Sequence, residues 1–214
     1  MTLRDILDEV KRELTEKERT REVAQEDMRK ATNFSKQSIL RHHQKKQEEA
    51  DKLIEKAKEL ILRLSTMAKE YPSIIYGGMF SAALQEYSEA AIFLTLAKET
   101  RFATPKELGV PSADYVLGLA DVIGEYRRLA LDALRVGDAE RGDECLKTMD
   151  EIYLELTALD EAYMLVPGLR RKCDIARRII ETTRGDVTQE VRRKTLEDYL
   201  KRFEETQLSR KGKK

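Results

Sequence analysis

Tryptophan is absent from this 214-residue chain, and proline, glycine, histidine and cysteine occur only 4, 10, 2 and 2 times. So little proline and glycine argues against turn-rich β-sandwiches and is typical of long helices with solvated flanks. Cys145 and Cys173 are isolated and form no CxxC pair, which argues against a disulfide framework or a zinc site. No run of apolar residues approaches the length of a membrane span. We therefore expect a protein with no membrane association.

An excess of charge is also missing, because 40 Lys and Arg residues balance 40 Asp and Glu residues. Binding to a polyanion must then depend on local clusters of basic residues rather than on net charge. The N-terminal stretch carries charges at every helical turn, unlike a secretory signal or a transit peptide. We expect a cytoplasmic protein.

Helical periodicity is what the sequence does contain. The first segment, Thr2–Lys69, has no Gly or Pro, and its two ends repeat apolar residues at heptad-like spacing around a polar middle. Later helices are predicted at about 79–99, Ser112–Arg135, 139–165, Leu169–Thr183 and 186–207, separated by Gly, Pro and Asp turn signals. A short connector with at most one helical turn spans about 101–112.

The predicted fold class is therefore all-α, with about six to seven long helices. We expect a single helical domain over residues 1–208 and a basic, disordered tail over 209–214. Long helices with continuous apolar stripes usually complete their burial against neighbours, so an oligomer is expected.

Two carboxylates on the 79–99 helix occupy an unexpected face. Glu86 and Glu89 lie about 60° apart on a helical wheel, among alanines and large apolar residues, whereas the polar face is elsewhere. Burying a carboxylate costs several kcal/mol unless a positive charge meets it. This pair therefore needs a partner.

A second acidic pair lies on the 112–135 helix. Asp121 and Glu125 are four residues apart and share a narrow stripe with Arg128, so a solvated face of ion pairs is one interpretation. If the two helices pack antiparallel, however, the four carboxylates converge, and their repulsion calls for a divalent cation such as Mg²⁺ or Mn²⁺. Such an ion polarises a phosphoryl oxygen and activates water. A di-iron site is disfavoured because the only histidines are the adjacent His42 and His43.

The stretches that carry these carboxylates resemble a known family. "ALQEYSEA" (residues 83–90) and "DYVLGLADVIGEYRR" (residues 114–128) are similar to stretches of the translin superfamily, and most of all to its catalytic branch, translin-associated factor X. "KETR" after the first of these helices and "LRRKCD" at residues 169–174 resemble the same superfamily. The similarity follows the order of elements over nearly the whole chain.

The resemblance implies a translin-like bundle that assembles into a closed octameric shell with an internal cavity. It also implies a Mg²⁺- or Mn²⁺-dependent endoribonuclease whose catalytic and metal-binding residues are Glu86, Glu89, Asp121 and Glu125. The stretch "YPSIIYGGMF" lacks the basic residues that translin carries there. A chain with features of both branches could form the shell alone, as a homo-octamer, or together with a separate translin-type subunit.

The polar middle of the first segment is the candidate surface for nucleic acid. Arg29, Lys36 and His43 recur every seven residues, and Lys and Arg at helical spacing suit contacts with phosphates. The same helix is rich in glutamate, so a solvated face of mixed charge remains the alternative interpretation. The full set of predicted nucleic-acid-binding residues is Arg21, Arg29, Lys36, Arg41, His43 and Arg128.

Three functions follow from these observations. The first is metal-dependent endoribonuclease activity on single-stranded RNA or short RNA duplexes inside the shell. The second is a translin-like protein that binds single-stranded nucleic acid without cutting it. The third is a structural helical scaffold without a ligand, in which the acidic stripe of the 112–135 helix makes only ion pairs between subunits.

Overall fold

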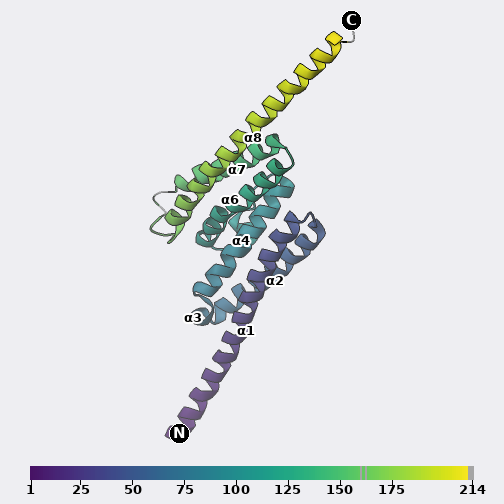
Figure 1. The fold of residues 1–214 in the computed structure, drawn as a ribbon. Helices are drawn as coiled ribbons and strands as arrows, with labels where there is room; N and C mark the ends of the chain where they lie inside the picture. The colour runs from purple at the N-terminus through teal and green to yellow at the C-terminus, as the bar shows by residue number, and fades with distance from the viewer. Residues whose placement is uncertain (160, 162, 212–214) are drawn as a thin grey trace. The chain divides into compact units, whose positions relative to one another are not determined.

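The computed structural model describes residues 1–159, 161 and 163–211, and all the regular secondary structure in this part is helical (Figure 1). The helices are α1 (Leu3–His43), α2 (Gln47–Glu70), α3 (Pro72–Ile75), α4 (Gly78–Glu99), α5 (Pro105–Leu108), α6 (Ser112–Arg135), α7 (Ala139–Thr157) and α8 (Leu169–Lys211). Six of them are long, which confirms the predicted all-α class. The described residues group into two compact units, Met1–Val122 and Ile123–Lys214, each considered by itself below. The closed shell and the single domain over 1–208 remain predictions.

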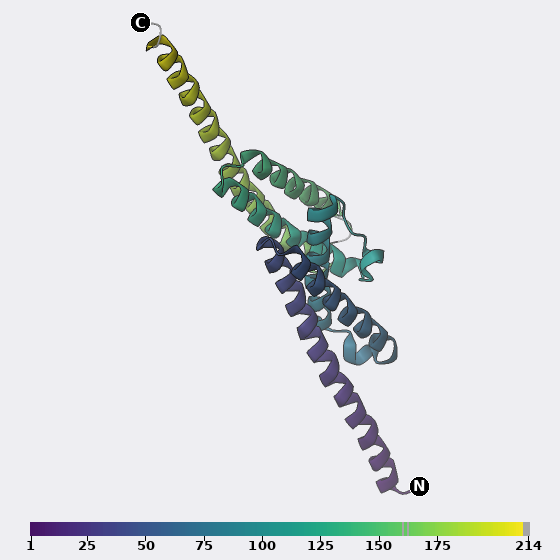
Figure 2. The ribbon, with the colours of Figure 1, turned by 90° about the vertical axis from the view of Figure 1, so that its right-hand side faces the viewer.

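The first unit is built on the antiparallel pair α1 and α2, which lie side by side (Figures 1 and 2). The predicted uninterrupted segment Thr2–Lys69 is wrong, because the chain reverses between His43 and Gln47. Lys45 adopts the left-handed conformation with φ 61°, and its amide donates to the carbonyl of His42 at 2.8 Å. This turn contains no Gly or Pro, so the sequence has no turn signal from which it could be predicted.

Small side chains allow α1 and α2 to pack closely. Ala24 and Ala31 of α1, with Ala57 of α2, are at most 1% exposed. Asp27 is also buried in α1, and its carboxylate forms an ion pair with the guanidinium of Arg63 on α2. A buried carboxylate is tolerated when a cation meets it, so this pair fixes the register of the two helices.

Helix α4 begins at Gly78 and ends at Glu99, as predicted, and is buried on most of its circumference. The rings of two histidines at the end of α1 cover Phe93 of α4. His42 meets that ring edge-on with centroids 5.0 Å apart, and His43 stacks on it at 5.3 Å with an interplanar angle of 25°. These contacts hold the C-terminal end of α1 against α4.

Burial makes His42 a pH-sensitive element of this packing. Desolvation lowers the pKa of His42 below its ordinary value of 6.5, although a 2.7 Å hydrogen bond to Oε1 of Gln47 opposes the shift. The folded state therefore binds a proton less readily than the unfolded state, and the stability present above pH 6.5 is lost as the pH falls below it. The melting temperature should decrease between pH 7.5 and pH 5.5.

A His42→Phe variant keeps a ring beside Phe93 but cannot titrate. Its melting temperature should fall less than that of the unaltered protein over the same pH interval, as thermal unfolding followed by circular dichroism would measure. Equal decreases in both proteins would assign the pH dependence to other groups.

The connector and the start of α6 follow the predicted signals. Thr104 caps α5 in a capping box with Glu107, and Gly109 ends it with φ 68°. Tyr115 then donates its hydroxyl to the carbonyl of Ala103 at 2.8 Å. This hydrogen bond ties the first turn of α6 to the connector that precedes it.

The second unit contains the end of α6 with α7 and α8. Helix α7 ends at Thr157, earlier than the predicted 165, and residues 160 and 162 lie outside the described part. The predicted turn at Gly185-Asp186 is wrong, because α8 is one continuous helix from Leu169 to Lys211. It therefore includes Ser209–Lys211, the beginning of the predicted disordered tail, whereas residues 212–214 are outside the described part.

An arginine of α6 contacts α8 at the place where the turn was predicted. Arg127 donates to the hydroxyl of Thr183 at 2.6 Å and reaches the carboxylate of Asp186 at 3.5 Å. The Asp186 side chain thus takes part in a contact between α6 and α8 and does not cap a helix as predicted.

Membrane insertion finds no support in these helices. Within the described residues, none is both long enough and apolar enough to cross a bilayer.

Candidate functional site

The contact between α4 and α6 in the first unit is a direct approach of two main chains at Gly118. A Cβ atom added to Gly118 would lie 2.6 Å from Cβ of Ser88, 2.7 Å from the carbonyl oxygen of Gln85 and 2.8 Å from the amide nitrogen of Glu89. Only glycine permits such an approach without displacement of backbone. Sequence reasoning missed this residue, although one glycine inside the carboxylate stripe of α6 is a signal for close helix packing.

Hydrogen bonds one turn earlier define the direction of the two helices. Asp114 of α6 accepts from the Ser81 hydroxyl at 2.5 Å and from the Gln85 amide at 3.3 Å, and Gly118 then meets residues 85, 88 and 89. Higher numbers on α6 thus face higher numbers on α4. The helices run parallel at this crossing, and the antiparallel packing considered from the sequence is wrong, because the connector with α5 carries the chain back to the start of α4.

The close approach brings Glu89 and Asp121 to the same crossing. Asp121 follows Gly118 by three residues, so it lies about 60° around α6 and about 4.5 Å further along the axis. The main chain of Glu89 is the part of α4 that Gly118 touches. Both residues are half-buried. One member of each predicted pair therefore lies on the helix segments that approach each other here.

Glu86 has a different environment, since it faces α1. Its Oε1 forms an ion pair with Nζ of Lys36 at 3.0 Å. The glutamate side chain is 27% exposed and the lysine side chain is 60% exposed. The predicted metal ligand and the predicted phosphate ligand thus contact each other. An ion pair this exposed contributes little stability, roughly 0–1 kcal/mol, so either side chain is free to exchange partners.

Glu125 is the fourth predicted carboxylate and is half-buried. It follows Asp121 by four residues on α6 and belongs to the second unit. Within residues 1–159, 161 and 163–211, no group of three or more His, Cys, Asp or Glu side chains lies close enough to hold a metal ion.

Two of the predicted nucleic-acid-binding residues share an open hollow between α1 and α4. Arg29 and Lys36 line a space of about 300 Å³ together with Asn33 of α1 and with Met79 and Ala82 of α4. Both cationic side chains are exposed. The hollow lies beside Glu86, because Lys36 borders both.

The other predicted nucleic-acid-binding residues have separate surroundings. Arg21 pairs with Glu18 at 2.5 Å, and Arg41 pairs with Glu49 at 3.1 Å. His43 packs on Phe93, as described above. Arg128 is exposed in the second unit. Of the predicted residues, the structure thus groups only Arg29 with Lys36 in one hollow. Arg21 has a partner within its own helix, Arg41 has a partner on α2, and His43 has an aromatic partner on α4.

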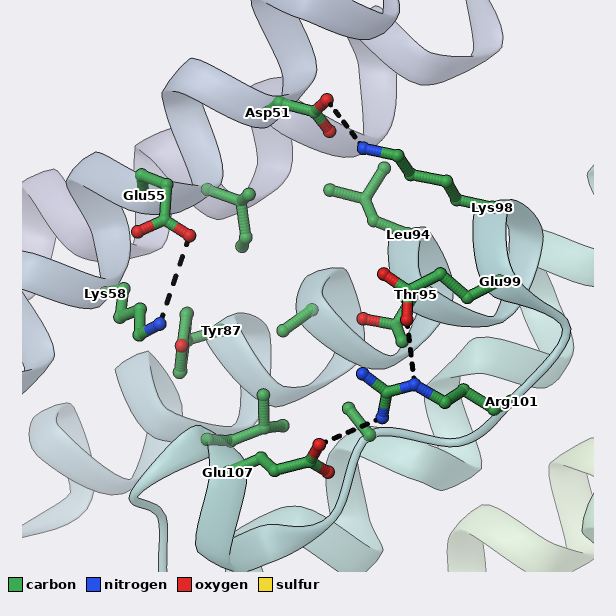
Figure 3. A pocket seen from close by; sticks show the side chains of 14 residues that line it. Asp51, Glu55, Lys58, Tyr87, Leu94, Thr95, Lys98, Glu99, Arg101 and Glu107 are labelled. Atoms are coloured by element: carbon green, nitrogen blue, oxygen red, sulfur yellow. Dashed lines mark hydrogen bonds and ion pairs between the residues drawn. The ribbon is translucent and has the colours of Figure 1, made fainter.

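A larger pocket of about 570 Å³ lies elsewhere in the first unit, between α2, α4 and the connector (Figure 3). Its cations are matched by carboxylates, because Lys98 reaches Asp51 at 3.2 Å and Arg101 reaches Glu99 at 2.8 Å and Glu107 at 3.0 Å. This matched charge is unsuited to a phosphate.

The tyrosine in that pocket remains protonated over the physiological range. Desolvation, with the nearby charge of Glu55 as a smaller cause, raises the pKa of Tyr87 to about 12. It is therefore a hydrogen-bond donor rather than a base. No motif in the sequence indicated this pocket.

A comparison with known families identifies the family of this chain. Residues 2–183 match the family model described as the translin family. The chain belongs to the translin family.

Solved structures share the translin-family fold of this chain. The structure of AfC3PO in complex with duplex RNA is 35% identical, with a TM-score of 0.77, over 86% of this chain and 95% of that one. Apo-NeC3PO is 26% identical, with a TM-score of 0.78, over 86% of this chain and 96% of that one. An uncharacterised protein of Methanocaldococcus jannaschii is 36% identical over 160 residues, which are 74% of this chain and 70% of that protein.

The translin-family match also has a boundary. It ends at Thr183, within α8, so the remainder of this helix continues beyond the part that the family model matches.

Proposed function

We propose that this translin-family chain is a metal-dependent endoribonuclease that cleaves single-stranded RNA or short RNA duplexes inside an octameric shell. The observation that supports it most is the main-chain contact at Gly118, which brings Glu89 and Asp121 to one helix crossing. The similarity to AfC3PO, whose structure was solved with duplex RNA, supports RNA as the substrate.

The donor chemistry at this crossing fits Mg²⁺ or Mn²⁺. Both ions prefer hard oxygen ligands, and Mg²⁺ is commonly held by one or two carboxylates together with waters and substrate phosphates. A carboxylate pair such as Glu89 and Asp121 therefore meets the requirement without a third protein ligand. A bound ion would polarise the phosphodiester and lower the pKa of an attacking water.

The residues of this chain would divide the remaining work. Glu89 and Asp121 would hold the ion. Glu86 pairs with Lys36 and Glu125 belongs to the second unit, and in the described residues no three carboxylates lie close enough to share a metal ion. Arg29 and Lys36, which share a hollow next to Glu86, would bind phosphates and position the strand without reading its sequence. Arg21, Arg41, His43 and Arg128 are further proposed contacts with nucleic acid.

Removal of divalent ions provides the direct test. A labelled RNA oligonucleotide should be cut in Mg²⁺ or Mn²⁺, should stay intact in EDTA, and should be cut again when the ion is restored. Denaturing gels measure the products, and light scattering measures whether the particle has the expected mass of a homo-octamer. RNA cleavage that continues unchanged in EDTA would contradict the proposal.

One observation favours a second function, binding without cleavage. Glu86 is occupied by Lys36, an arrangement that neutralises a carboxylate without any ion. A purely binding protein would retain RNA on a gel, lose it steeply as salt rises, and yield no products in Mn²⁺.

A further inference from the structure

The N-terminal arm, defined as residues Leu3–Leu14 of α1, carries an apolar stripe that the described part of its own chain leaves exposed. Every residue from Met1 to Arg19 is exposed. Leu7, Val10 and Leu14 repeat at the spacing of a coiled-coil seam, and they are 56%, 43% and 60% exposed. The first turns of α1 extend past α2 (Figures 1 and 2).

The C-terminal arm, defined as residues 191–206 of α8, repeats the same feature. All of its residues are exposed. Leu196, Leu200 and Phe203 have the spacing of a seam and are 58%, 50% and 53% exposed. The family model ends at Thr183, so this arm is an addition of this chain to the matched region.

Charges beside the two stripes differ in sign. In an antiparallel coiled coil, the residue that follows each d position faces its counterpart on the other helix. On the N-terminal arm these flanking residues are Arg4 and Lys11, both basic. On the C-terminal arm they are Glu197 and Glu204, both acidic. All four side chains are exposed. Within the C-terminal arm, Oε1 of Glu197 lies 3.8 Å from Nε of Arg193.

One antiparallel register satisfies both the stripes and the charges. Facing Val10 with Leu200 also faces Leu7 with Phe203 and Leu14 with Leu196. The same register sets Lys11 beside Glu197 and Arg4 beside Glu204.

Pairing of like arms is disfavoured by the same residues. Two N-terminal arms in this antiparallel geometry would oppose basic side chains, and two C-terminal arms would oppose acidic ones. Like charges placed against each other are a means of excluding wrong partners.

We infer that the N-terminal arm of one copy forms an antiparallel coiled coil with the C-terminal arm of a second copy of this chain. The partner is identified by the matched apolar layers and by the opposite charges that flank them. This interaction surface is independent of the proposed nuclease activity. It adds a contact between copies, and the C-terminal arm that forms it lies beyond residue 183, where the translin-family match ends.

Cysteine cross-linking of two differently tagged chains tests the pairing. Val10→Cys in one chain and Leu200→Cys in the other place one cysteine on each side of a single layer. The two chains are co-expressed, so that any disulfide between them is intermolecular, and non-reducing gels with mass spectrometry identify it. The mixed cross-link should exceed either same-tag cross-link by roughly tenfold, because flanking charges select the partner.

The unaltered chain is the background control, since its cysteines, Cys145 and Cys173, are both buried. Same-tag cross-links as abundant as the mixed one, or no cross-link above background, would overturn the inference.

Charge reversal adds a readout that tests the register. Lys11→Glu in the first chain should reduce the mixed cross-link severalfold, and Glu197→Lys in the second should restore it. The matched control is Arg12→Glu, which changes the same charge one residue away on the outer face of the arm and should leave the yield unchanged. An equal effect of the Lys11 and Arg12 variants, or no restoration, would overturn the register.

Discussion

An Asp121→Asn substitution should reduce RNA cleavage in Mg²⁺ by at least about 100-fold while the protein remains folded. Asparagine keeps the size of the side chain but removes the negative charge that would hold the ion. Metal assistance is worth several kcal/mol of transition-state stabilisation, and each 1.36 kcal/mol changes a rate about tenfold. Initial rates on a labelled RNA, measured under saturating metal, give the comparison. Glu89→Gln should have a similar effect, because Glu89 lies at the same crossing.

The matched control is Asp132→Asn on the same helix. Asp132 forms a partly exposed ion pair with Arg135 at 3.4 Å, and its loss should change the rate less than about twofold, because such pairs contribute little. Equal RNA affinity of the Asp121 variant and the unaltered protein, measured by gel shift, would separate catalysis from binding. Full cleavage activity in both the Asp121 and Glu89 variants would refute the assignment of this site.

A Gly118→Ala substitution should lower the free energy of unfolding by about 1–3 kcal/mol, the usual cost of forcing extra atoms into a packed contact. The added Cβ would meet the backbone of α4 at 2.7 and 2.8 Å, and backbone cannot rotate away as a flexible side chain does. For a chain of this size, each kcal/mol corresponds to about 2–4 °C in melting temperature. Thermal unfolding followed by circular dichroism measures the shift.

Gly124→Ala is the matched control, since Gly124 lies on the same helix and a Cβ there meets nothing within 4 Å. That substitution should raise stability by about 0.5–1 kcal/mol, because alanine loses less conformational entropy in a helix. A Gly118 variant as stable as the Gly124 variant would mean that the two helices can separate slightly without cost.

The helices were predictable where local signals and packing agree. Gly77-Gly78 precedes α4 and Ser112 opens α6, and both helices have the predicted ends. The turn predicted at Gly185-Asp186 is instead part of the continuous helix α8. There Arg127 of α6 donates hydrogen bonds to the side chains of Thr183 and Asp186. The turn at Lys45 could not be predicted, since lysine rarely adopts a left-handed conformation.

The candidate site was predictable in its residue types but not in its arrangement. Helical spacing placed Glu86 and Glu89 outside the polar face of their helix, and both side chains are half-buried. Spacing within one helix carries no information on the direction of its neighbour, so the parallel crossing and the diversion of Glu86 to Lys36 required the structure. Gly118, which lies at this crossing, was missed because glycine carries no side chain with a chemical function.

The main-chain contact at Gly118 also constrains how the first unit of this protein can move. Where side chains separate two helices, one helix can shift against the other when these side chains change rotamers. Main-chain atoms in direct contact have no rotamers to change, so they allow no such shift. Any rearrangement within the first unit must therefore carry the α4 segment at Glu89 and the α6 segment at Asp121 together, as parts of one rigid block.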